Sequence, residues 1–78
     1  MRFKEAVSKR ILELCDNYDY TPNRLAELSA IPPTNLRRIL ANDVENPSTY
    51  IIYKICKTLK IEIKDFFDSD YFREDFDD

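Results

Sequence analysis

The chain has 78 residues and a formal net charge of −3, with 44% hydrophobic and 35% charged residues but no histidine, glycine or tryptophan. This length supports one domain, and it leaves no room for a core together with a deep catalytic cavity. The missing histidine and glycine remove the commonest general base, the usual zinc sites and any Gly-rich phosphate loop, so we expect neither an enzyme nor a cofactor.

Apolar residues at helical spacing divide the chain into five predicted helices and place it in the all-α class. The helices cover about residues 3–18, 22–29 and 33–41, a segment that begins at Pro47 and Ser48 and runs to Leu59, and residues 63–67. Thr21 is a good N-cap for the second helix, and Ser48 for the fourth. Asn42 suits the left-handed position after the third helix, and Phe66 is expected to enter the core.

The second and third predicted helices are separated by a tight turn. The pair Pro32-Pro33 ends the second helix, because the residue before a proline is pushed out of the α region, and Pro33 can then open the third. Leu36 and Ile39 follow at helical spacing and face the core. Two short helices joined in this way, crossing near a right angle, form a helix-turn-helix.

These segments resemble the Xre family of helix-turn-helix regulators, the lambda-repressor-like and Cro-like proteins. The resemblance covers roughly residues 8–67 and includes the later segments 46–61 and 63–67. It implies a five-helix lambda-repressor-like DNA-binding domain, which we place at residues 1–68, before an acidic and aromatic tail at residues 69–78. The family usually has Gly at the turn where this chain has Ala30. If Ala30 keeps a positive φ, alanine costs roughly 1 kcal/mol there, and the alternative is a slightly remodelled turn.

The third predicted helix presents polar side chains away from its apolar stripe. Arg can bind guanine, and Asn adenine, through two parallel hydrogen bonds in the major groove. By resemblance, base contacts come from the first turn and the middle of this helix, which here are Pro33, Thr34, Asn35, Arg37 and Arg38. Phosphate contacts are expected from Thr21, Asn23 and Asn42, and the loop after Asn42 could touch the DNA backbone too. The alternative for both arginines is an ordinary solvated helix face.

The negative charge is concentrated near the C-terminus. Residues 1–42 hold seven basic and five acidic side chains, residues 43–61 three and two, and residues 62–78 two and eight. Residues 1–61, which contain the helix-turn-helix, are therefore only mildly basic. Affinity for DNA would need a few well-placed contacts and dimerisation. We expect a small transcriptional regulator, a repressor, that binds double-stranded DNA as a homodimer. The alternative is a protein-interaction module on the same fold, antitoxin-like or an oligomerisation partner, with weak or no DNA binding.

The tail leaves three interpretations open: a disordered segment, a segment that pairs two copies, and a shield over the DNA face. For the second interpretation, the dimer interface would consist of aromatic residues, namely Phe67, Tyr71, Phe72 and Phe76. It predicts that deletion of residues 69–78 weakens self-association.

The two cysteines and the hydropathy bear on location. Cys15 and Cys56 lie on predicted apolar faces and are expected to be buried free thiols rather than a disulfide. No segment is apolar enough for a membrane helix or a signal peptide, and no small-molecule ligand is indicated. We therefore expect a cytoplasmic protein.

Overall fold

The computed structural model describes residues 1–77, which form five α-helices and one short 3₁₀ helix without any strand. The elements are α1 (Phe3–Tyr18), α2 (Pro22–Leu28), α3 (Pro33–Leu40), α4 (Thr49–Leu59), α5 (Ile63–Phe67) and the 3₁₀ helix η1 (Asp70–Phe72). The predicted all-α, five-helix fold is confirmed, and each observed helix boundary lies close to the predicted one. Only η1 was not predicted, because three residues are too few to produce an apolar period.

Local capping explains where two of these helices begin and how α3 ends. The Thr21 hydroxyl accepts a hydrogen bond from the backbone N–H of Arg24 at 3.1 Å, and Ser48 caps α4 in the same way through Ile51, also at 3.1 Å. Asn42 has a φ of 63°, so it occupies the predicted left-handed position after α3. These three predictions are confirmed.

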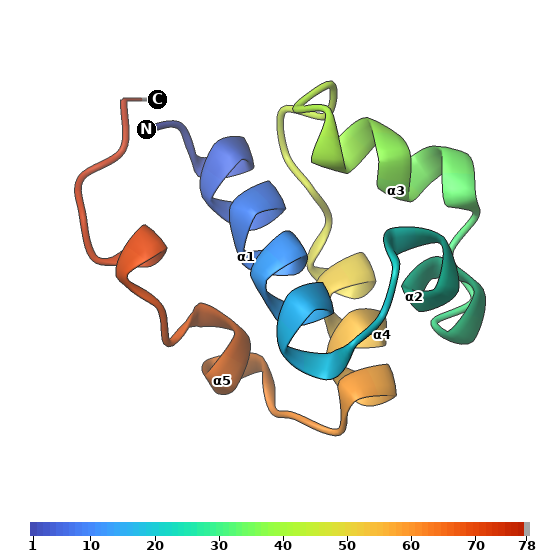
Figure 1. The fold of residues 1–78 in the computed structure, drawn as a ribbon. Coiled ribbons are helices and arrows are strands. Elements are labelled where there is room, and N and C mark those ends of the chain that lie inside the picture. The colour runs from blue at the N-terminus through green and yellow to red at the C-terminus, as the bar shows by residue number, and fades with distance from the viewer. Residues whose placement is uncertain (78) are drawn as a thin grey trace.

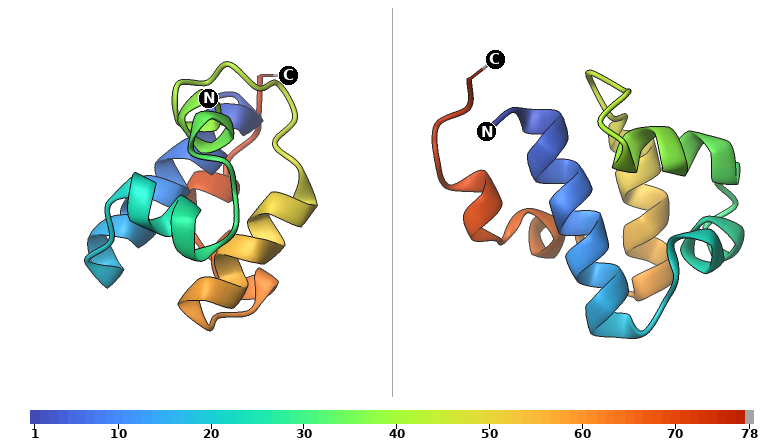
Figure 2. Two further views of the ribbon diagram at one scale, coloured as in Figure 1. Left: turned by 90° about the vertical axis from the view of Figure 1, so that its right-hand side faces the viewer. Right: turned by 45° about the horizontal axis from the view of Figure 1, so that its top comes forward.

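Helix α1 crosses the middle of the molecule (Figure 1). Helices α2 and α3 lie on one side of it, α5 and the C-terminal segment lie on the other, and α4 lies behind it in this view (Figures 1 and 2). The core between the helices consists of buried side chains, namely Val7, Ile11, Leu14, Cys15, Leu25, Ala26, Ile31, Leu36, Ile39, Ile52, Ile55, Cys56, Leu59 and Phe66. No helix within residues 1–77 is long and apolar enough to cross a bilayer.

The core settles two predictions about single residues. Phe66 is completely buried, as expected. Cys15 and Cys56 are both buried and free, which confirms that they form no disulfide. Burial is the main cause that raises the pKa of each thiol, and a neighbouring carboxylate adds to it in both cases, Asp16 for Cys15 and Asp65 for Cys56.

The C-terminal segment folds back along α1. The ring of Phe72 lies with its centre 4.8 Å from that of Phe67 and 6.0 Å from that of Phe66. Further along, the ring of Phe76 meets that of Phe3 edge to face, with the centres 5.7 Å apart. The aromatic residues of the tail therefore extend the core of their own chain over the outer side of α1.

The acidic side chains of this segment lie far from α3. The amino group of Met1 is 3.3 Å from a carboxylate oxygen of Asp77 and 3.4 Å from one of Glu74, so the segment returns to the start of α1. Both views that show α1 lengthwise place the segment across α1 from α3 (Figures 1 and 2). The interpretation of the tail as a shield over the DNA face of its own chain is therefore wrong for residues 69–77. Asp78 lies outside the described residues.

Candidate nucleic-acid interface

The turn between α2 and α3 is held by hydrogen bonds on both of its sides. The backbone N–H of Ile31 donates to the carbonyl of Ala26 at 2.9 Å, which closes the end of α2. The ammonium group of Lys54 on α4 donates to the carbonyl of Ala30 at 3.2 Å. Ala30 has a φ of 55°, so alanine adopts the left-handed conformation that the turn requires. The positive φ is therefore kept rather than avoided by a remodelled turn, and this is the case in which alanine is expected to cost roughly 1 kcal/mol.

Helix α3 is held against the core by one side only. Leu36 is 1% exposed and Ile39 is 2% exposed, while the opposite side of the helix is open to solvent. That open side carries all the residues predicted to contact bases, and we call it the reading face: Pro33, Thr34, Asn35, Arg37 and Arg38. These residues are exposed on α3, the second helix of the helix-turn-helix. A DNA duplex can therefore approach them without any rearrangement of the core.

The two arginines of the reading face differ from the other arginines. Neither Arg37 nor Arg38 forms an ion pair within residues 1–77, and Arg37 only donates a hydrogen bond to the Thr34 hydroxyl at 3.3 Å. Each remaining arginine of the described chain lies against a carboxylate, and these are Arg2, Arg10, Arg24 and Arg73. The guanidinium donors of the reading face are therefore free to bind an anion or a base edge.

Shallow hollows flank the reading face on both sides. One, of about 580 Å³, is lined by Thr21, Pro22, Asn23, Arg37, Leu40 and Ala41. The other, of about 230 Å³, is lined by Asn35, Arg38, Ile39, Val44, Asn46, Ser48 and Ile51. The predicted phosphate contacts Thr21 and Asn23 thus lie beside Arg37 of the reading face, and their contact with a phosphate stays a prediction.

Asn42 has a different environment from Thr21 and Asn23. It is half-buried, and its side-chain oxygen accepts a hydrogen bond at 3.0 Å from the hydroxyl of Ser8, a residue of α1 that is 4% exposed. The structure therefore gives Asn42 a role in attaching the end of α3 to α1. Its contact with a phosphate stays a prediction.

The residues predicted to pair two copies are partly used within the chain. Phe67, Phe72 and Phe76 are half-buried in the aromatic contacts described above, and Tyr71 lies beside α1. Their part in a dimer interface stays a prediction.

The loop after Asn42, which the sequence predicts as a further contact to the DNA backbone, leads to the second of these hollows. Asn46 of this loop and Ser48, which was predicted only as an N-cap, line the hollow next to Arg38. A signal was present, because two polar residues precede a helix of eleven residues whose first N–H groups have no partner inside the helix.

Two helices joined by a tight turn, the second exposed and bearing unpaired arginines, define a helix-turn-helix protein of the DNA-binding class. In a comparison with known families, residues 10–70 match the Cro/C1-type HTH DNA-binding domain. The chain belongs to this family, which confirms the predicted resemblance and makes double-stranded DNA the partner of the domain. Comparisons with curated proteins and with solved structures find no match.

Proposed function

We propose that the chain is a transcriptional repressor that recognises a specific DNA sequence with α3 in the major groove. The observation that supports this most is the pair of exposed arginines without acidic partners on the reading face. Arg38 and Arg37 would each bind a guanine through two parallel hydrogen bonds, and Asn35 an adenine. Pro33 has no N–H donor and would contact a thymine methyl group.

The proposed complex places the duplex backbone in the two hollows beside α3. Thr21 and Asn23 would bind a phosphate on one side, and Asn46 and Ser48 one on the other. A homodimer would bind a near-palindrome whose half-sites are about 34 Å apart, one helical turn of DNA. Repression then follows because the bound dimer blocks polymerase, in the cytoplasm and without catalysis or a cofactor.

The test uses a duplex selected from a random pool. We expect the logarithm of the association constant to fall linearly with the logarithm of the salt concentration, because neutralised phosphates release counterions. Arg38→Ala should weaken binding by about 1–3 kcal/mol and relax the preference at one base pair. Arg73→Ala is the matched control, since it removes the same charge from the C-terminal segment across α1. Equal affinities of the two variants for the selected duplex would contradict the proposal.

A second candidate is a protein-interaction module on the same fold, antitoxin-like, with weak or no DNA binding. The net charge of −3 and the exposed Pro32-Pro33 pair at the start of the reading face favour it. This candidate predicts that no sequence is enriched from the pool and that binding to random duplexes disappears at moderate salt.

A further inference from the structure

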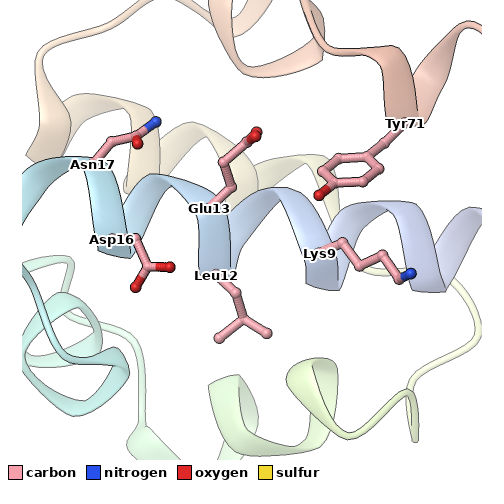
Figure 3. Close-up of a pocket in the computed structure, with 6 residues that line it drawn as sticks. All are labelled: Lys9, Leu12, Glu13, Asp16, Asn17 and Tyr71. Carbon is pink, nitrogen blue, oxygen red and sulfur yellow. The ribbon is translucent and has the colours of Figure 1, made fainter.

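Helix α1 presents an exposed stripe on the side opposite α4. The stripe consists of Lys9, Leu12, Glu13 and Asp16, which follow one another at helical spacing and so share one face. Together with Asn17 and Tyr71 these residues line an open hollow of about 480 Å³ (Figure 3). Leu12 lies near the centre of the stripe and is 43% exposed. Figure 3 shows the Leu12 side chain projecting away from the helix. The centre of the stripe therefore carries an accessible apolar side chain beside the carboxylate of Glu13.

The two ends of the stripe carry opposite charges that have no partner within residues 1–77. Lys9 stands at one end and Asp16 at the other, about 10 Å apart along the helix axis. Neither of them forms an ion pair in the described part of the chain, whereas Glu13 between them is bound to Arg10 at 2.6 Å. The stripe thus has an unpaired positive charge at one end and an unpaired negative charge at the other, with Leu12 and the Arg10-bound Glu13 between them.

We propose that this stripe binds the same stripe of a second copy, with the two α1 helices antiparallel. A surface of this kind is self-complementary, because reversing one copy brings Lys9 of each opposite Asp16 of the other and leaves the two Leu12 side chains in contact. Tyr71, at the edge of the hollow, packs against the second α1. The proposal deepens the proposed function, on which it rests, by specifying how two reading faces are joined.

The position of α3 gives this arrangement its functional consequence. Two antiparallel helices stacked face to face are related by a two-fold axis. This axis lies in the plane between the two helices and is perpendicular to their helix axes. Since α3 lies to one side of α1 and the C-terminal segment to the other, rotation about this axis keeps both α3 helices on the same side of the dimer (Figures 1 and 2). Both reading faces then lie on the side of the dimer from which one duplex can approach, as a palindromic site requires. A parallel pairing would place them on opposite sides and bring like charges together.

The test is a charge exchange measured by sedimentation without DNA. Lys9→Glu and Asp16→Lys should each weaken the homodimer at least tenfold, because each variant opposes like charges at both ends of the contact. An equimolar mixture of the two variants should associate again as a heterodimer, since every contact then joins opposite charges. Lys64→Glu, which makes the same charge change on the exposed side of α5, serves as the control and should dimerise like the unmodified chain.

A second measurement locates the two-fold axis directly. Leu12→Cys should form a disulfide between two copies under mild oxidation, while the buried Cys15 and Cys56 remain reduced. A chain that is monomeric at every concentration, or a mixture of the charge variants that associates no better than each alone, would overturn the proposal. Binding to a duplex with a single half-site tests the proposed function separately, because it needs only one reading face and should persist in all these variants.

Discussion

The hydroxyl of Ser8 on α1 lies 3.0 Å from the side-chain oxygen of Asn42, the residue that follows the end of α3. Asn42 combines this bond with a left-handed backbone, and its own N–H donates to the carbonyl of Ile39 at 3.1 Å. One residue therefore ends the reading helix and attaches it to the helix that crosses the molecule. The orientation of the reading face depends on a contact between residues 34 positions apart in the sequence.

Asn42→Ala should lower the free energy of unfolding by about 1–3 kcal/mol, because it removes the hydrogen bond between α1 and the end of α3 and puts alanine in a left-handed conformation. The Ser8 hydroxyl then keeps only the Glu5 carbonyl as its acceptor. Urea denaturation followed by circular dichroism measures the change. Asn42→Asp keeps an acceptor oxygen and a residue that tolerates this conformation, and Asn42→Gly keeps only the conformation. Both should lose less than the alanine variant. Equal losses in all three would show that neither feature matters.

Ala30→Gly should raise the free energy of unfolding by about 0.5–1 kcal/mol, because glycine reaches a positive φ without the steric cost that alanine has. The control is Ala41→Gly, since Ala41 has a φ of −86° and gains nothing from glycine. Thermal unfolding of the two variants gives the comparison. A melting temperature that rises for Ala41→Gly and not for Ala30→Gly would contradict the assigned turn conformation.

Arg10 attaches α1 to the end of α5, and its removal should be costly. Its guanidinium donates to the carbonyl of Phe66 at 2.7 Å and to that of Asp65 at 2.8 Å. We expect Arg10→Met to lower the free energy of unfolding by about 1–3 kcal/mol, since hydrogen bonds from a charged group are lost. Arg10→Lys should rescue little, because an ammonium cannot reproduce the forked geometry.

Arg24→Met provides the control for Arg10. Arg24 pairs with Glu27 on the exposed surface of α2, and such pairs contribute about 0–1 kcal/mol. Denaturation curves in which Arg24→Met is as destabilising as Arg10→Met would count against the attachment of α5 by Arg10.

The buried thiols predict a loss of stability at alkaline pH. Burial raises the pKa of Cys15 and of Cys56 above the ordinary value of 9.0, so the folded state disfavours the thiolates. This contribution is fully present below the pKa of the unfolded chain and is lost as the pH rises through the higher pKa of the folded one. Urea denaturation between neutral pH and pH 10 should therefore give a smaller alkaline decrease for the Cys15→Ala, Cys56→Ala double variant. Identical pH profiles would refute this contribution.

Deletion of residues 69–78 should weaken self-association, as the sequence predicts, because it removes Tyr71 from the edge of the α1 hollow. The deletion also removes Phe72 from its contacts with Phe66 and Phe67, so it should lower stability as well. Tyr71→Ala separates the two effects, since it leaves Phe72 in place. Sedimentation that shows an unchanged monomer–dimer equilibrium in both variants would exclude a part for Tyr71.

The sequence by itself determined the helices, the turn and the residues of the reading face. Each of these depends on neighbours within a few positions: proline after the turn, a hydroxyl before a helix, and apolar side chains at helical spacing. The turn was predictable even with Ala30 in place of glycine, since the flanking apolar pattern restricts the chain more strongly than the roughly 1 kcal/mol that alanine costs there.

Only the tertiary structure decided which charged side chains are neutralised and what the tail covers. Arg10, Arg37 and Arg38 look alike in the sequence, but only Arg10 is brought to acceptors of a distant segment, more than 50 positions away. The sequence likewise shows Asn42 only as a polar residue after a helix. Its hydrogen bond with Ser8 of α1 becomes visible only in the structure. Such pairings depend on where segments that are far apart in the sequence meet in three dimensions. Helical periodicity carries no information about the distance between two such segments or about their relative direction.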